Sequence, residues 1–310
     1  MKGGPLDSES DFDLAGLTTN PNFVAGYVAL VGRPNVGKST LMNRFLDERI
    51  AIVTHKPQTT RRKTLGILNG EGHQVILLDT PGIMDPEYSL HRAMIADAIR
   101  ALQDADVIVF IVDSRAPVEM IDAIAESKQP CILAINKIDA LKRRDDLLPK
   151  LEAYHALGRF DEVVPLSALH GEGVDVLLKS MLDRLPKSPP FYPPDQIAEQ
   201  PERFFVAEII RERIFELFEQ EVPYSTEVKI EEFREGGAKD FIEATIYAET
   251  ASQKMILIGK GGRAIKALGE EAREAVEAFL GREVFLALRV KLLPKWRKKG
   301  ESLRKLGYRA

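Results

Sequence analysis

The sequence Gly32-Arg33-Pro34-Asn35-Val36-Gly37-Lys38-Ser39 has the residue types and spacing of a phosphate-binding loop. An apolar run precedes it and a helical pattern follows it, and in this setting backbone N–H groups and a helix N-terminus surround a phosphate. Lys38 would reach the β- and γ-phosphates, and the Ser39 hydroxyl would hold Mg²⁺. The alternative is a glycine-rich turn with a surface lysine. The predicted phosphate contacts are Asn35, Val36, Gly37, Lys38, Ser39 and Thr40.

The tetrapeptide Asn136-Lys137-Ile138-Asp139 comes directly after another apolar run and indicates recognition of guanine. The Asp139 carboxylate can accept from two guanine N–H groups, an arrangement that adenine does not offer, and a site built on such a pair rejects analogues strongly. Asn136 would brace the loop and touch the base, and Lys137 would lie along the base and ribose. Further along, Ser167 and Ala168 are placed to offer a backbone N–H to guanine O6. An ATP-using P-loop enzyme is the alternative that Asp139 disfavours.

Two further loops carry residues suited to a γ-phosphate and its Mg²⁺. Asp79 ends an apolar run and could reach Mg²⁺ through a water, while the N–H of Gly82 senses the γ-phosphate. The stretch 58–62 contains two threonines, and one of them can complete the Mg²⁺ shell when the γ-phosphate is present. We favour Thr60, with Thr59 as second choice; a flexible polar loop is the alternative. The predicted metal ligands are Ser39, Thr60 and Asp79, and the predicted catalytic residues are Lys38, Thr60 and Gly82.

These motifs need a frame that delivers them to one place. Strand-like runs alternate with helical patterns over residues 26–185, as in a mostly parallel, doubly wound α/β sheet. The tetrapeptide Asn69-Gly70-Glu71-Gly72 predicts one antiparallel hairpin within that series. Ligands of such sheets bind at the carboxyl ends of the strands, where the motifs lie. We expect strands at 27–31, 63–69, 74–78, 107–112, 130–135 and 162–165, and helices near 38–46, 90–103, 117–126, 142–156 and 173–184.

The remaining residues divide into a tail, a linker and a smaller domain. Residues 1–25 are polar and acidic without the features of a secretory signal, and we expect a poorly ordered tail. Residues 186–201 contain six prolines, which predicts a stiff, extended linker. The pattern of 202–310 predicts an α+β layout in the order α-β-β-α-α-β. Its expected helices are 202–219, 252–258 and a longer one after Gly262, and its expected strands are 225–233, 240–248 and 283–293.

Composition limits the class of protein and the cellular environment that fit this chain. A chain of 310 residues with 45% hydrophobic and 29% charged residues is typical of a soluble globular protein of about two domains. No apolar run approaches the ~20 residues of a membrane span. The lone Cys131 lies in a buried-strand pattern and cannot form an internal disulfide, which fits a reducing, cytoplasmic compartment. A catalytic thiol is the less favoured alternative.

Charge is distributed unevenly along the chain. Residues 282–310 hold ten basic and two acidic side chains, a formal charge of +8. The other residues carry a formal charge of −12, which gives the net charge of −4. A basic block on an acidic protein suggests a polyanion partner. A solubilising basic tail is the alternative, and peripheral membrane contact through this block stays open.

Taken in order, these pieces resemble the Era family of ribosome-assembly GTPases, among the translation-factor-like GTPases. The resemblance covers about residues 25–310, nearly the whole chain. It implies a first domain that binds GTP or GDP with Mg²⁺ and hydrolyses GTP, and a type II KH domain as the second. The segments that carry it are GRPNVGKST, KPQTTRRKTLGI, LLDTPGI, NKID, SAL, IGKGGRAIKALG and the terminal Lys305-Leu306-Gly307-Tyr308.

A KH domain clamps about four single-stranded nucleotides against its GxxG loop. Here that loop is Gly259-Lys260-Gly261-Gly262, and a plain turn between two helices is the alternative. Lys291, Lys295 and Arg297 are further predicted RNA contacts. The resemblance implies that the RNA is the 3′ end of small-subunit ribosomal RNA and that the protein acts in assembly of the small ribosomal subunit. We expect a monomer.

One residue departs from Ras-like chemistry. Ile83 follows Gly82 where Ras-like enzymes place a glutamine that orients water, so intrinsic hydrolysis should be slow. Related GTPases with asparagine at the position of Asn35 use it to ligate K⁺, which puts positive charge between the α- and γ-phosphates. In this chain Asn35 either ligates K⁺ or only shapes the loop.

The function that joins these features is that of a GTP-switched RNA-binding protein with slow GTP hydrolysis. The linker and the contact between domains would carry the nucleotide state to the KH domain. Two other functions compete with it. One is a passive RNA-binding module whose GTP site is only structural. The other is a GTPase assisting transfer-RNA modification, which would carry an additional catalytic domain that this pattern lacks.

Overall fold

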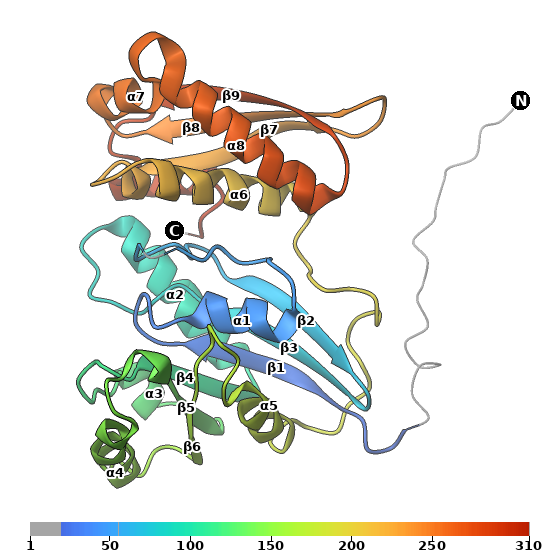
Figure 1. Ribbon diagram of the computed structural model, residues 1–310, viewed down its shortest axis with the longest axis vertical. Coiled ribbons are helices and arrows are strands. Elements are labelled where there is room, and N and C mark those ends of the chain that lie inside the picture. Colours follow the sequence, from blue (N-terminus) through green and yellow to red (C-terminus); the bar gives the residue numbers. More distant parts are fainter. Residues whose placement is uncertain (1–19, 55, 310) are drawn as a thin grey trace, which may run out of the picture.

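The computed structural model describes residues 20–54 and 56–309, which form two units, one above the other in Figure 1. The first unit is a six-stranded sheet with helices on both faces. The second is a three-stranded sheet with its own helices, and the α/β and α+β classes expected of the two units are confirmed. Residues 1–19 of the expected tail lie outside the described residues, and strand β1 already begins at Val24.

The first sheet has the strand order β2-β3-β1-β4-β5-β6. Only β2 and β3 are antiparallel, as the hairpin signal predicts, and the other neighbours are parallel. Its strands are β1 (Val24–Val31), β2 (Thr64–Gly70), β3 (His73–Asp79), β4 (Val107–Asp113), β5 (Cys131–Asn136) and β6 (Glu162–Pro165). Its helices are α1 (Lys38–Leu46), α2 (Ser89–Asp104), α3 (Asp122–Ala125), α4 (Leu148–Ala156) and α5 (Val174–Leu182).

Alternate residues of the central strands feed two separate cores. Val28 and Leu30 of β1 pack in one cluster with α1 and α5, whereas Ala29 and Val31 pack in another with α2, α3 and α4. Strands covered on both faces must be apolar at nearly every position, which explains the unbroken run in β4, Val107–Val112. Both faces of the sheet are therefore packed, and its carboxyl edge carries the connecting loops.

Two expected helices of the first unit are shorter in the structure. The expectation for 117–126 was wrong in extent, since α3 covers only Asp122–Ala125. The helix expected at 142–156 begins as a 3₁₀ turn, Arg144–Leu147, and becomes α4 only at Leu148, with a proline in its first turn. Proline fits the first turn of a helix but not its interior, so Pro149 explains this late start.

The second unit has the strand order β7-β8-β9 and the predicted succession of elements. β7 and β8 are antiparallel, and β9 runs parallel to β8. Leu286, Leu288 and Val290 of β9 pack against the helices, so the intervening residues face the other side of the sheet. The elements are α6 (Glu202–Leu217), β7 (Thr226–Arg234), β8 (Asp240–Ala248), α7 (Ala251–Ile258), α8 (Arg263–Leu280) and β9 (Val284–Leu292).

The proline-rich segment 186–201 is extended, but it does not hang free between the units. Its Ile197 carbonyl accepts from the Ile67 N–H, and its Gln196 carbonyl accepts from the Asn69 side chain, both on strand β2. Gln74 of β3 further binds the backbone at Phe191 and Tyr192. Because the segment covers the outer edge of the first sheet, it attaches the second unit as well as spacing it.

The C-terminal residues return to the first unit. After β9, a 3₁₀ turn (Trp296–Lys298) and helix α9 (Gly300–Lys305) lead to Tyr308. Fully buried Trp296 and Leu303 share a cluster with Leu90 and Met94 of α2. The indole N–H of Trp296 donates to the Ser225 carbonyl at 2.9 Å. This segment thus joins the last strand of the second unit to a helix of the first.

Leu303→Ala should weaken the attachment of the C-terminal segment. Truncating this fully buried side chain leaves a cavity, at an expected cost of about 2–5 kcal/mol. Trp296 is the only tryptophan of the chain, so its fluorescence reports this contact during urea unfolding. The midpoint should fall in Leu303→Ala and stay unchanged in the control Leu148→Ala, at an exposed position. Equal midpoints in all three proteins would show that the segment adds no stability.

Candidate functional site

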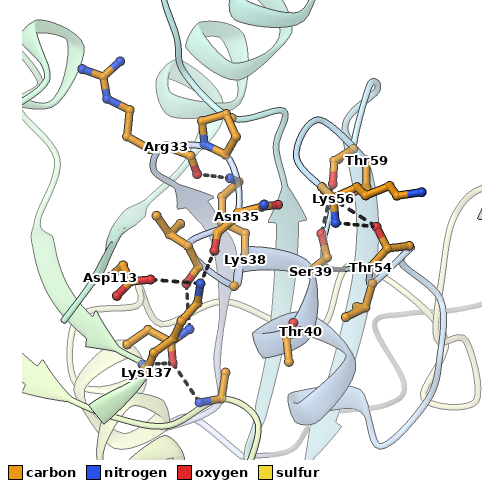
Figure 2. Close-up of a pocket in the computed structure, with 18 of the residues that line it drawn as sticks. Arg33, Asn35, Lys38, Ser39, Thr40, Thr54, Lys56, Thr59, Asp113 and Lys137 are labelled. Carbon is orange, nitrogen blue, oxygen red and sulfur yellow. Dashed lines mark hydrogen bonds and ion pairs between the residues drawn. The ribbon is translucent and has the colours of Figure 1, made fainter. Parts of the chain in front are cut away.

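A cavity of about 1330 Å³ opens at the carboxyl edge of the first sheet. Figure 2 shows the phosphate-binding loop, Asp113 and Lys137 converging on it, with Thr54, Lys56 and Thr59 on its other side. Asp79 and Ser167 lie next to the lining residues, and both are fully buried. The predicted residues that line it are Asn35, Val36, Gly37, Lys38, Ser39, Thr40, Thr60, Gly82, Asn136, Lys137, Asp139 and Ala168.

The phosphate-binding loop owes its shape to positions that few side chains tolerate. Gly37 has φ 100°, and a Cβ there would lie 2.2 Å from the side-chain nitrogen of Asn136, so only glycine fits. Asn35 also has positive φ, at 63°. Helix α1 starts at Lys38 without a side-chain cap, which leaves the N–H groups of its first turn directed at the cavity. A phosphate would satisfy these donors.

Lys38 is held inside this loop. Its Nζ donates to the Arg33 carbonyl at 2.9 Å and lies 3.4 Å from the Gly32 carbonyl oxygen. Burial lowers the pKa of Lys38 to about 8, and the nearby Asp79 carboxylate only partly offsets that effect. A buried ammonium with a lowered pKa gains from an anion beside it. The lysine ammonium is thus positioned to bind phosphate oxygens, and a phosphate beside it would stabilise its charged form.

Three oxygen-bearing side chains meet beside Lys38. Ser39 Oγ lies 2.7 Å from Asp79 Oδ2 and 3.0 Å from Thr60 Oγ1, and Thr60 Oγ1 lies 3.2 Å from the same carboxylate oxygen. Asp79 Oδ1 is buried and has no hydrogen-bond partner, and burial raises the pKa of Asp79 against the pull of Lys38 and the two hydroxyls. A hard cation would satisfy this carboxylate, so the residues fit Mg²⁺. Of the two threonines expected here, Thr60 faces the site.

Gly82 and Ile83 lie against the phosphate-binding loop. A Cβ at Gly82 would come within 2.6 Å of the Pro34 nitrogen, so the absence of a side chain permits this approach. The Ile83 N–H donates to the Gly32 carbonyl at 3.1 Å, and the Ile83 side chain is buried in the core. The isoleucine is a packing residue and offers no group that could orient water.

Asn136 braces the end of the cavity where a base would lie. Its side chain donates to the Val36 carbonyl at 2.8 Å and accepts from the N–H groups of Lys137 and Ala168. The Ala168 N–H, which was expected to donate to guanine O6, donates to the Asn136 side chain in this structure. Asp139 lines the cavity with a partly exposed carboxylate, 4.0 Å from His170 Nε2.

Asp113 is a site residue that the sequence analysis missed. It lies 3.0 Å from Lys137 Nζ and accepts from Arg115, and these contacts lower its pKa although burial opposes them. This network fixes Lys137, whose backbone has the unusual φ of 65°. The signal was available, because Asp113 ends a buried strand at the carboxyl edge. Phe215 and Glu216 of α6 also line the cavity, and no local pattern links them to it.

The expected RNA-binding loop lies at the surface of the second unit, with Lys260 and Gly261 exposed. Gly259, Gly261 and Gly262 have φ of 71°, 62° and 77°, and the loop lies between α7 and α8. A Cβ at Gly259 would meet Ala264 at 2.7 Å, whereas the other two glycines face open space. Lys260 is exposed beside them. The backbone is therefore accessible to a phosphate chain.

The three basic residues predicted as further RNA contacts differ in their surroundings. The alternation of β9 puts Lys291 on the sheet face opposite the helices, so it does not share a surface with the loop. Lys295 is exposed just before Trp296. Arg297 turns into the contact between the units, where it pairs with Glu249 and donates to the Tyr88 hydroxyl at 3.2 Å. Its guanidinium also lies over the Tyr88 ring.

Cys131 is fully buried, and burial raises the pKa of its thiol to about 12, so it is not a reactive nucleophile.

Among the described residues, none of the helices has the length and apolar character needed to cross a membrane.

Comparison with known proteins agrees with this geometry. Residues 27–137 match a family model described as 50S ribosome-binding GTPase, and residues 221–297 match one described as KH domain. The chain is 42% identical over 293 residues to GTPase Era of Syntrophus aciditrophicus (strain SB), which covers 92% of this chain and 95% of that protein. It is 40% identical to GTPase Era of Alkaliphilus metalliredigens (strain QYMF), over 93% of this chain and 99% of that one.

Solved structures lead to the same family. A variant of Era from Aquifex aeolicus bound to GDP·AlF₄⁻ superimposes with a TM-score of 0.89 at 39% identity, over 92% of this chain and 99% of that one. A structure of Era with MgGDPNP and nucleotides 1506–1542 of 16S ribosomal RNA also gives 0.89, at 38% identity and the same coverage. At these identities and coverages, the chain belongs to the Era family of GTPases.

Proposed function

We propose that this protein binds the single-stranded 3′ region of small-subunit ribosomal RNA through its KH unit, and that GTP binding and slow hydrolysis control this contact during small-subunit assembly. The observation that carries the proposal is the meeting of Ser39, Thr60 and Asp79 beside Lys38, in a chain that also exposes a GxxG loop. A passive module has no need for a threonine on a separate loop to reach the metal site. A relative in complex with 16S nucleotides supports the choice of RNA.

Hydrolysis follows from positioning and charge. The P-loop amides and Lys38 would hold the β- and γ-phosphates and stabilise the charge that develops on them. Ser39, Thr60 and Asp79 would hold Mg²⁺, which supplies further positive charge to the phosphates when bound. Gly82 would place its N–H toward the γ-phosphate. Because Ile83 cannot orient water, the basal rate should be low.

Guanine recognition would use the residues beyond Asn136. Asp139 would accept from the two guanine N–H groups, Lys137 would lie along the base and ribose, and the Ser167–Ala168 backbone would face O6. The Asp113–Lys137 ion pair at 3.0 Å holds the lysine in that position. Nothing in the described residues favours a role in transfer-RNA modification.

Asp139→Asn tests guanine recognition, and the wild type measured beside it shows whether the protein turns over GTP. Losing a charge-assisted pair should weaken GTP binding by about 2–5 kcal/mol, and xanthosine triphosphate should become the preferred substrate because it can donate to asparagine's oxygen and accept from its amide. Binding is measured by calorimetry and turnover by phosphate release. A wild type that binds GTP without hydrolysing it would support the passive module. Equal GTP affinity in wild type and variant would contradict the assignment of Asp139.

Hydrolysis should be faster in KCl than in NaCl at equal ionic strength. A K⁺ ion held by Asn35 would add positive charge between the α- and γ-phosphates, where Ile83 gives no help. The difference should vanish in Asn35→Gly, a variant chosen because glycine accepts the φ of 63° that Asn35 adopts. Equal wild-type rates in the two salts would leave Asn35 as a residue that only shapes the loop.

Charging the GxxG loop should abolish RNA binding and spare GTP binding. Lys260→Asp with Gly261→Asp puts two carboxylates where RNA phosphates should lie. The matched control is Lys239→Asp with Gly237→Asp, since Gly237 also has positive φ and open space around it. Fluorescence anisotropy with a short single-stranded RNA should show a steep loss only in the first variant. If both variants bind like wild type, Gly259–Gly262 is only a turn.

A further inference from the structure

The loop between α1 and β2, here called the switch loop (residues 50–54 and 56–63), is held by the second unit near its start, at Lys56 and at its end. Near its start, Glu212 of α6 accepts from the Val53 N–H at 3.3 Å and pairs with Arg49 at 2.8 Å. Further on, Lys56 Nζ donates to the Phe215 and Phe218 carbonyls at the end of α6. Figure 2 shows Thr54, Lys56 and Thr59 of this loop beside the cavity.

The end of the switch loop is tied to a buried carboxylate. Glu227, the second residue of β7, lies 2.7 Å from Arg61, and each of these side chains is only 4% exposed. Glu227 also accepts from the Tyr308 hydroxyl at 2.8 Å and lies 3.3 Å from Arg62. Burial by itself would raise the pKa of Glu227, but Arg61, Arg62 and Arg211 outweigh burial and lower it. The carboxylate is charged and fully engaged.

These contacts enclose the proposed Mg²⁺ ligand. Thr60 lies between Thr59, whose carbonyl accepts from Arg211 of α6, and Arg61, which Glu227 holds. Arg61 also donates to the carbonyls of Pro223 and Tyr224 in the second unit. Thr60 Oγ1 in turn lies 3.0 Å from Ser39 Oγ. Both chain neighbours of Thr60 are therefore fixed by the KH unit.

We propose that Glu227 and Arg211 are positioning residues for GTP hydrolysis, so that the RNA-binding unit completes the GTP site by holding Thr60 at the metal. This inference rests on the proposed GTPase function. Thr60 is expected to serve only the triphosphate state, so the effect is specific to GTP and spares GDP. Since coupling between two sites is reciprocal, a ligand that shifts α6 of the KH unit changes Mg²⁺·GTP affinity, and GTP changes affinity for that ligand.

Glu227→Gln in the full-length protein tests this inference. The variant keeps the side-chain size but removes the charge that pairs with Arg61. The matched control is Asp240→Asn, which neutralises another nearly buried carboxylate of the same sheet, paired with Arg282 at 2.6 Å. Mg²⁺ is titrated in GTP turnover assays, and fluorescent GDP and a non-hydrolysable GTP analogue are used for binding.

We expect Glu227→Gln to lower kcat and to raise the Mg²⁺ concentration at half-maximal turnover, each by about tenfold, the usual size of the effect when a group supporting a metal ligand is removed. GDP affinity should change less than twofold, and Asp240→Asn should behave like wild type. If Glu227→Gln does not fold, as judged by Trp296 fluorescence, Tyr308→Phe takes its place, because it removes only the hydroxyl that donates to Glu227.

Wild-type kcat and Mg²⁺ dependence in a folded Glu227→Gln or Tyr308→Phe protein would overturn the inference. An equal loss of GTP and GDP affinity would also overturn it, because general loosening of the cavity would then explain the result. A wild-type protein that does not hydrolyse GTP at all would instead contradict the proposed function, so the two failures are distinguishable.

Discussion

The parallel register of the first sheet is the constraint on which the nucleotide site depends. β1 pairs Leu30 with Asp79 of β3, and β4 pairs Asp113 with Asn136 of β5. Because these strands all point the same way, their last residues lie side by side and the loops that follow open onto one edge. A slip of one residue in a strand would turn its final side chain to the other face. The phosphate, metal and base contacts are thus set by strand pairing before any loop is considered.

Local motifs made much of this site predictable. The phosphate-binding loop and the guanine-selecting tetrapeptide are short, and each follows a strand whose apolar run is unmistakable. The Asn69–Gly72 turn likewise identified the antiparallel pair of the first sheet. Helix α3 was less predictable, because the segment before it makes other contacts instead: Arg115 bonds locally to Asp113, and Glu119 pairs at 3.0 Å with Arg33, which is distant in the sequence. Such contacts override helix propensity.

Contacts between the units could not be predicted from a single sequence. Arg61 and Glu227 are 166 positions apart in the sequence, and neither belongs to a sequence pattern that predicts its partner. Charge counting suggested a polyanion partner but could not show where each charge lies. Within the basic C-terminal block, Arg297 is paired with Glu249 and Arg289 with Glu243. Only the fold distinguishes a basic side chain that is free to meet a partner from one that an acidic neighbour already pairs.

The C-terminal segment has a consequence for how the protein is made. Arg62 donates to the Leu306 carbonyl, a contact between residues 244 positions apart. Domains generally fold as units in the order of synthesis, so the first sheet is complete long before this partner leaves the ribosome. During that interval Arg61 and Arg62 lack Glu227, Leu306 and Tyr308, and the loop that carries Thr60 has no surface to hold it. A newly made chain therefore acquires these supports of the Thr60 loop only after residues 306–308 have been synthesised and have docked.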